Sequence, residues 1–238
     1  MRKLGIIGGT SWHSTALYYD HINRGVAQRL GGLHSARLCI ESLDLAPIAE
    51  MEHAGDWDGV AKETLDAAKR LEASGAEGMI ITSNTGHKVF DAVAANIDVP
   101  MLHIGDAVAD RLVADRQTRV AWLGTRFTMT EGHVRDRLER RGIQLAPIDA
   151  GWIREIDRII FDELAAGRVT RDSQRKLKTL ITELAKQKVQ AVVLGCTELV
   201  LAVDTRANVL PVYDTTEIHA RACVEWMLAE GEEARAAA

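Results

Sequence analysis

Four short loops carry the residues of this sequence whose types and spacing could do chemistry. They are Gly8-Gly9-Thr10-Ser11, Ser83-Asn84-Thr85-Gly86-His87, Gly124-Thr125 with Thr128, and Gly195-Cys196-Thr197-Glu198. Each follows an apolar run and opens a helix-like segment, so its backbone N–H groups and helix dipole can hold a carboxylate without an arginine. Any one loop alone is also what a tight strand-to-helix turn with an N-cap requires. The four together favour a site for a small anionic ligand.

Cys196 is the candidate acid/base of this set. It follows the apolar run 190–194 and begins a helix-like segment. Backbone N–H groups there favour the thiolate, so we expect a pKa well below the usual value of about 8.5. Such a thiolate can remove a proton from carbon. The alternative is a small buried apolar residue, which is the interpretation we favour for Cys39 and Cys223.

Composition narrows the class of ligand. The chain has 238 residues, 47% of them hydrophobic and 26% charged, and a formal net charge of -5. No stripe of basic and aromatic residues points to nucleic acid, and no apolar segment reaches the length of a membrane span. No GxGxxG or GxxxxGK[ST] motif points to a nucleotide. Three widely spaced cysteines fit a reducing cytoplasm, so we expect a cytoplasmic protein with a small-molecule partner.

The elements that position the loops alternate between strands and helices. Short runs rich in Val, Ile and Leu predict eight strands, and amphipathic segments such as 57–74 and 171–188 predict surface helices. The predicted strands are 3–7, 37–42, 77–82, 99–103, 119–124, 143–146, 190–194 and 208–213. This alternation is typical of an α/β fold with parallel sheets covered on both faces.

A weak internal repeat divides these strands into two sets. GMIITSNTGHKVF at 78–90 parallels AVVLGCTELVLAV at 191–203, and LGIIGGTSWHST at 4–15 parallels VAWLGTRFTMT at 120–130. VPMLHIGDAVA at 99–109 likewise parallels VLPVYDTTEIHA at 209–220. The repeat predicts two similar domains of about four parallel strands each, with a ligand between them. We expect residues 1–98 and 212–238 in the first domain and 99–211 in the second.

As a set, these motifs resemble the aspartate/glutamate racemase family over nearly the whole chain. The motifs that carry the resemblance are GGTSWHSTALYYDHIN at 8–23, LGGLHSA at 30–36, SNTGHK at 83–88, PMLHIGDA at 100–107, LGTRFTM at 123–129, LGCTE at 194–198 and LPVYDTTEIHA at 210–220. The family implies a homodimer that works without a cofactor, with two domains related by a pseudo-twofold axis. The sequence shows no cluster of metal ligands, so we also expect no metal. The substrate that the family implies is an acidic amino acid that loses and regains its α-proton. Usually two cysteines transfer this proton, one on each face of the α-carbon.

In this sequence the resemblance assigns the second cysteine to Cys196 and places Ser83 where the first cysteine usually stands. A serine hydroxyl is a much weaker acid than a thiol, so the two positions are not chemically equivalent. Further residues would bind the α-carboxylate and amino groups or line the site. These are Gly9, Thr10, Ser11, Asn84, Thr85, Thr125, Thr128, Thr197 and Glu198. His87 would support Ser83 or pack at its helix start, and Glu198 would be either a supporting base or a helix-start carboxylate.

Several alternatives remain open at this stage. A single cysteine also suits a decarboxylase of substituted malonates, and a protein without turnover could simply bind an amino acid. Arg126 is a candidate partner for the distal carboxylate, or a surface residue after its turn. Lys88 lacks a neighbouring partner for pyridoxal phosphate, so we expect it in solvent. Aspartate and glutamate differ by one methylene, which the sequence does not distinguish.

Overall fold

The computed structural model describes residues 1–236, with the side chains of residues 1–229. The chain divides into two compact units. Unit 1 comprises Met1–His103 and the segment from His219 onward, and unit 2 comprises Ile104–Ile218. The chain therefore crosses from unit 1 to unit 2 once and returns once. Both crossings lie a few residues later in the sequence than the expected boundaries.

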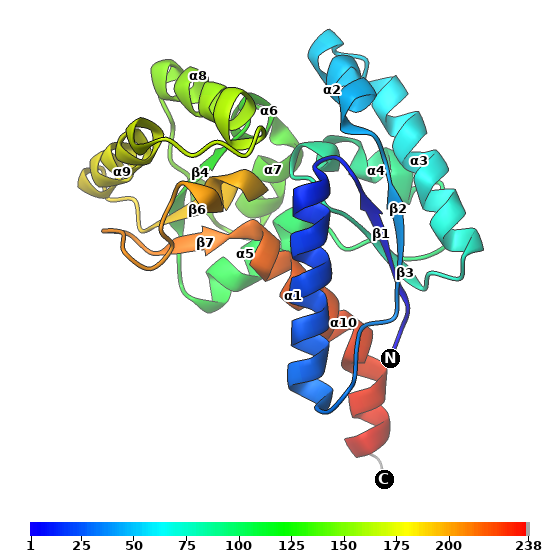
Figure 1. Ribbon diagram of the computed structural model, residues 1–238. Coiled ribbons are helices and arrows are strands. Elements are labelled where there is room, and N and C mark those ends of the chain that lie inside the picture. The colour runs from blue at the N-terminus through cyan, green and yellow to red at the C-terminus, as the bar shows by residue number, and fades with distance from the viewer. Residues whose placement is uncertain (237–238) are drawn as a thin grey trace. The chain divides into compact units, whose positions relative to one another are not determined.

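Unit 1 is built on a three-stranded parallel sheet in the order β2-β1-β3 (Figure 1). Its elements are β1 (Leu4–Gly8), α1 (Trp12–Leu30), β2 (Leu38–Ser42), α2 (Leu45–Ala54), α3 (Trp57–Ala73), β3 (Gly78–Ile81), the 3₁₀ helix η1 (Thr85–Val89), α4 (Phe90–Ala94) and most of α10 (Thr215–Ala236). The predicted strand 99–103 is reduced to one bridge between Met101 and Met79. Pro100 has no N–H to donate, and α5 begins soon afterwards at Ile104, so no longer ladder forms.

Side chains alternate between the two faces of this sheet, as the two-residue period of a strand requires. Ile7, Met79 and Ile81 belong to one apolar cluster with residues of α2, α3 and α4. The intervening Leu4, Ile6 and Ile80 belong to a second cluster with residues of α1 and α10. Helices therefore cover both faces, which explains why these strands read as continuous apolar runs (Figure 1).

Unit 2 is built on a four-stranded parallel sheet in the order β5-β4-β6-β7. Its elements are α5 (Ile104–Ala114), β4 (Arg119–Gly124), α6 (Arg126–Thr130), α7 (Gly132–Arg140), β5 (Gln144–Leu145), α8 (Ala150–Arg158), the π-helical turn η2 (Ile159–Leu164), α9 (Arg171–Lys186), β6 (Ala191–Gly195), the 3₁₀ helix η3 (Thr197–Leu201) and β7 (Val212–Asp214). The predicted strand 208–213 begins only at Val212. Because β7 is hydrogen-bonded to β6, residues 212–214 complete the second sheet and not, as predicted, the first domain.

The two sheets share one strand order, as the internal repeat predicts. In each sheet the first strand of the unit, β1 or β4, has a strand on both sides. One of its neighbours, β3 or β6, leads into a short 3₁₀ helix, η1 or η3. The bridge at Met101 beside β3 corresponds to β7 beside β6. Loops after neighbouring parallel strands lie at one sheet edge, so each unit brings two of the four predicted loops together.

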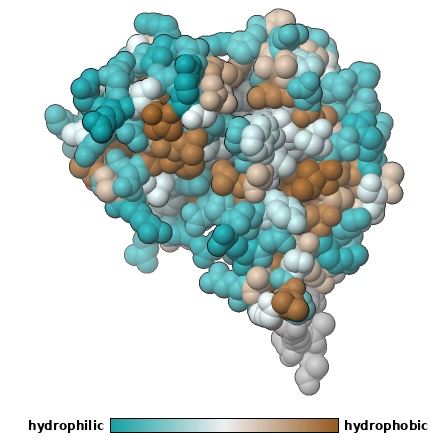
Figure 2. Space-filling view, in the orientation of Figure 1, coloured by the Kyte–Doolittle hydropathy of each residue, from teal (hydrophilic) through white to brown (hydrophobic). Residues whose placement is uncertain are grey.

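On the face shown in Figure 2, hydrophilic residues lie around separate apolar patches. The most exposed large apolar side chains of the described residues include Trp12, Tyr19, Leu33 and Val209. Among the described residues, no helix is both long enough and apolar enough to span a membrane.

Glu52 is a buried carboxyl group in α2, and it makes the stability of the protein depend on pH. Burial raises its pKa from 4.5 to about 7, and the charges of His53 and Lys88 offset this only in part. The unfolded chain ionises Glu52 above about pH 4.5, whereas the folded chain keeps it protonated up to about pH 7. The contribution of protonated Glu52 to the free energy of unfolding is therefore fully present below about pH 4.5, and it is lost as the pH rises through 7.

Glu52→Gln removes this ionisation while keeping the shape of the side chain. We expect the variant to gain about 2 to 3 kcal/mol in free energy of unfolding over the native protein at pH 8, and much less at pH 4.5. Urea unfolding at both pH values measures the difference. Glu50→Gln, an exposed change in the same helix, is the control. An equal gain at both pH values would show that folded Glu52 is not protonated.

Candidate functional site

In unit 1 the loops after β1 and β3 form the first cluster of predicted site residues, because these strands are neighbours. Thr15 joins the two loops. Its Oγ1 accepts a hydrogen bond from Gly9 N at 2.9 Å and lies 3.2 Å from Thr82 Oγ1. The loop with Gly9, Thr10 and Ser11 and the loop with Ser83, Asn84 and Thr85 therefore lie at the same edge of the sheet.

The loop after β1 has an unusual backbone. Gly9 has a φ of 83°, and a Cβ there would lie 2.0 Å from Leu43 O, so only glycine fits. Ser11 has a φ of 114°, which is rare for a residue with a side chain, and its Oγ accepts from Ser14 N to cap α1. Thr10 Oγ1 is buried without a hydrogen-bond partner among the described residues. Strain and an unsatisfied hydroxyl together are typical of a ligand-binding loop.

Ser83 is half-buried at the start of the second loop. Its Oγ accepts a hydrogen bond from Gly86 N at 3.1 Å, which leaves its own O–H group to donate elsewhere. His87 Nδ1 lies 2.6 Å from the Ser83 carbonyl oxygen and donates to it. Through this hydrogen bond His87 supports the backbone of Ser83. Asn84 and Thr85 are both buried within the same turn.

In unit 2 the loops after β4 and β6 form the second cluster, again because these strands are neighbours. Thr125 caps α6 by accepting from Thr128 N, and Thr128 Oγ1 donates back to Thr125 O at 3.0 Å. After β6, Cys196 Sγ donates to Glu198 Oε2 at 3.0 Å, and Thr197 Oγ1 donates to the same oxygen at 2.8 Å. Glu198 thus accepts from both residues that precede it.

The ionisation of Cys196 differs from the sequence-based prediction. Burial raises the pKa of its thiol well above the ordinary value, and the Glu198 carboxylate raises it further. The predicted lowering rested on a helix dipole, but η3 has only five residues and supplies little of one. Cys196 therefore needs a base to become a thiolate. Glu198 Oε2 is already placed to accept its proton.

Glu198→Gln tests this arrangement, because it removes the negative charge while keeping a group of the same size. We expect the pKa of Cys196 to fall, so the pH at which iodoacetamide alkylates Cys196 at half its maximal rate should move to lower pH. Mass spectrometry of the Cys196 peptide follows the reaction. Glu63→Gln, an exposed change in unit 1, should leave the profile where it is. An unchanged profile in Glu198→Gln would show that the Glu198 carboxylate does not influence the pKa of the Cys196 thiol.

Asp157, in α8, is not among the site residues that the sequence predicts. Its Oδ1 accepts a hydrogen bond from Arg126 N at 2.7 Å, and its charge also raises the pKa of Cys196. Arg126 itself is exposed, with its guanidinium 4.5 Å from the centroid of the Phe127 ring. No signal in the sequence marks Asp157, because it is one of several charged residues along an amphipathic helix.

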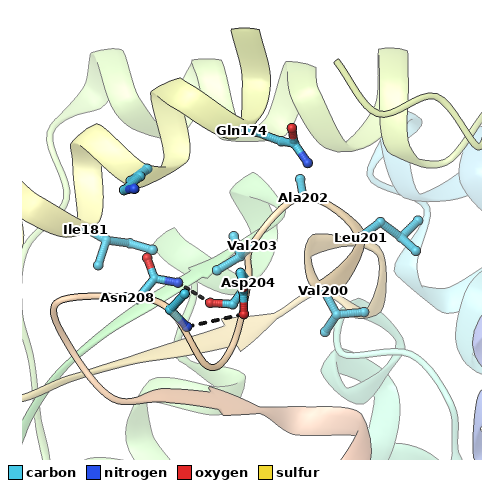
Figure 3. A pocket seen from close by; sticks show the side chains of 10 residues that line it. Gln174, Ile181, Val200, Leu201, Ala202, Val203, Asp204 and Asn208 are labelled. Carbon is cyan, nitrogen blue, oxygen red and sulfur yellow. Dashed lines mark hydrogen bonds between the residues drawn. The ribbon is translucent and has the colours of Figure 1, made fainter. Parts of the chain in front are cut away.

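Two further features lie outside both clusters. Lys88, predicted to stand in solvent, is half-buried with its ammonium 3.7 Å from the centroid of the Trp57 ring, because an aromatic face attracts a cation. A cavity of about 310 Å³ in unit 2 is lined by residues of α9 and by residues 200–204, 207 and 208, including Gln174, Val203 and Asp204 (Figure 3). None of the predicted site residues lines it. Within the described part of the chain, no group of three or more His, Cys, Asp or Glu residues could hold a metal ion.

The sequence is similar to a family of known proteins over most of its length. The Asp/Glu/hydantoin racemase family model matches residues 7–223. The chain belongs to this family. As a family member, this racemase is similar to a glutamate racemase of Koribacter versatilis, at 29% identity over 81% of the chain and 69% of that protein.

Two solved structures are similar to this racemase in both sequence and fold. A candidate Asp/Glu racemase from Yersinia pestis shares 40% identity with a TM-score of 0.90, covering 96% of this chain and all 100% of that one. An aspartate racemase homologue from Pyrococcus horikoshii shares 33% identity with a TM-score of 0.83, covering 95% of this chain and 99% of that one. The predicted α/β fold with two parallel sheets is therefore confirmed, and the family supports amino-acid racemisation.

Proposed function

We propose that this racemase inverts the α-carbon of aspartate or glutamate without a cofactor, with Cys196 as the principal acid/base and Ser83 as the second proton-transfer group. The observation that carries the proposal is the hydrogen bond from Cys196 Sγ to Glu198 Oε2 at 3.0 Å. It couples the family's second cysteine to a base, as an activated thiol requires.

The first step begins at Cys196. Glu198 Oε2 takes the thiol proton, and the thiolate then removes the α-proton of the amino acid to leave a carbanion. Because burial raises the pKa of Cys196, its thiolate is a strong base once formed. The thiol that now carries the α-proton can exchange it with solvent and return the solvent-derived proton to the same face, which exchanges the α-hydrogen without inversion.

Ser83 supplies the proton for inversion. Its O–H group donates to the opposite face of the carbanion, and solvent water then reprotonates the oxygen. The hydrogen bond from Gly86 N to Ser83 Oγ stabilises negative charge on that oxygen as the proton leaves. In the reverse direction Ser83 would have to act as the base, which is harder for a hydroxyl near neutral pH.

The remaining predicted residues bind the substrate in this proposal. The hydroxyl groups of Thr10, Thr125 and Thr197, with the backbone N–H groups of their loops, suit the α-carboxylate and amino groups. The unsatisfied Thr10 Oγ1 is the clearest single donor or acceptor for them. Which acidic amino acid is preferred depends on the depth available to the distal carboxylate, for which Arg126 is the proposed partner.

Isothermal titration with the L- and D-forms of aspartate and glutamate, beside a polarimetric assay, tests the function. We expect binding and loss of optical rotation with at least one of these amino acids. Binding without turnover would replace the proposal with an amino-acid-binding protein. Turnover of a substituted malonate with release of carbon dioxide, and no racemisation, would replace it with a single-cysteine decarboxylase.

A further inference from the structure

Four ring residues form a buried cluster behind the Ser83 loop of unit 1, and the proposed chemistry uses none of them directly. Tyr18, His87, His103 and His219 are each at most 4% exposed. They come from α1, η1, the segment before α5, and α10. We call them the histidine cluster.

The hydrogen bonds of His219 fix its tautomer. Its Nε2 lies 3.1 Å from the Leu102 carbonyl oxygen, which can only accept, so Nε2 carries the proton. Its Nδ1 then accepts from the Tyr18 hydroxyl at 2.9 Å. Burial lowers the pKa of His219 to about 4, so the ring stays neutral and in this tautomer near neutral pH.

His87 is held by the rest of the cluster and holds Ser83 in turn. Its Nδ1 donates to the Ser83 carbonyl at 2.6 Å. Its ring stacks on Phe90 with centroids 5.6 Å apart, and it meets His103 and His219 edge-on at centroid distances of 4.5 and 5.8 Å. The His87 ring therefore cannot turn away from Ser83 without displacing its neighbours.

The cluster also includes the points where the chain changes unit. The chain leaves unit 1 after His103 and returns at His219. The hydrogen bond from His219 to Leu102 ties these two segments together within unit 1. His103 and His219 lie in these crossing segments and contact the His87 ring directly. A displacement of either segment would therefore displace the His87 ring.

We propose that His87 is a positioning residue for Ser83, and that His103, His219 and Tyr18 hold its ring so that the Ser83 hydroxyl stays aligned for proton delivery. The proposal rests on the proposed role of Ser83 in inversion. The carbanion has two competing fates, inversion through Ser83 and return of a proton by Cys196. The proposal makes His87 important for inversion and not for proton return.

Two matched variants at position 87 separate positioning from general structure. In His87→Asn the side-chain amide nitrogen takes the place of Nδ1 and can still donate to Ser83 O. In His87→Gln the amide nitrogen lies closer to the position of Nε2, so this hydrogen bond is lost. In deuterated solvent we expect His87→Gln to lower inversion of the Cys196-handled enantiomer at least about tenfold, while exchange without inversion changes less than about threefold. His87→Asn should keep both rates near those of the native protein.

Amide hydrogen exchange at Gly86 provides a readout that needs no turnover. Gly86 N donates to Ser83 Oγ, so loss of the loop's support should expose this amide. We expect exchange at Gly86 to be at least about tenfold faster in His87→Gln and unchanged in His87→Asn. Equal losses of inversion and exchange without inversion, or a Gly86 amide as protected in His87→Gln as in the native protein, would overturn the proposal. If the native protein exchanges no α-proton, the proposed function fails, and the Gly86 result still decides the role of His87.

Discussion

Replacing Cys196 by alanine is expected to abolish exchange of the substrate's α-proton with deuterated solvent. A positioned acid/base contributes about 10² to 10⁴-fold to such a step, and Cys196 is the proposed base for one enantiomer and the acid for the other. We therefore expect the exchange rate to fall at least about 10³-fold, as measured by proton NMR of aspartate and glutamate in deuterium oxide.

The other two cysteines are the matched controls. Cys39 lies in β2, where its thiol faces the Leu4 carbonyl, and Cys223 lies in α10, fully buried in an apolar cluster with residues of β1 and α1. Cys39→Ala and Cys223→Ala should keep exchange within about threefold of the native rate, because neither residue belongs to a loop cluster. Exchange that survives in Cys196→Ala would remove the mechanism proposed here.

The second large effect concerns the two enantiomers, which should lose their α-protons at unequal rates. Cys196 has Glu198 beside it as a base, whereas the described hydrogen bond to Ser83 Oγ comes from a backbone donor. Deuterium should therefore enter at least about tenfold faster from the enantiomer whose α-hydrogen faces Cys196, which by likeness to the family we expect to be the L-form. The final ratio must still reach one, because the enantiomers have equal free energy in achiral solvent.

Ser83→Cys should reduce this asymmetry by supplying a thiol on the second side. The measurement is deuterium incorporation, followed separately from L- and D-aspartate and from L- and D-glutamate. We expect the slower enantiomer to gain at least about tenfold in exchange rate while the faster one changes little. Native rates that are equal for both enantiomers and unaffected by Ser83→Cys would show that residue 83 does not transfer protons.

The parts of the fold that could be read from the sequence are those set by local pattern. The amphipathic period of residues 57–74 and 171–188 places α3 and α9 within two residues of their observed ends. The apolar runs before Gly8, Ser83, Gly124 and Gly195 place all four loops at strand ends, because such runs suit strands buried on both faces. Strand lengths at sheet edges were less predictable, since pairing partners and not local sequence decide them.

The parts that could not be read depend on contacts made in three dimensions. The pKa of Cys196 was predicted in the wrong direction because it depends first on the burial of the thiol and then on the position of Glu198 Oε2, 3.0 Å from Sγ, and both are set by three-dimensional packing. Asp157 reaches the same environment from 39 positions earlier in the chain, through a hydrogen bond to a backbone N–H that no motif records. Likewise β7 joins the second sheet because it pairs with β6.

The return of the chain at His219 has a consequence for the order in which the protein folds during synthesis. Unit 2 is one continuous stretch, so all of its core is available once residue 218 has been made. One face of the first sheet, in contrast, needs Val224, Met227 and other residues of α10 to complete its core. Domains generally fold as units during translation, N-terminal ones first, but here the N-terminal unit must wait for the C-terminal helix. Until then the apolar side chains of Leu4, Ile6 and Ile80 lack part of their cover, and chaperone binding to the nascent chain would be concentrated on that face.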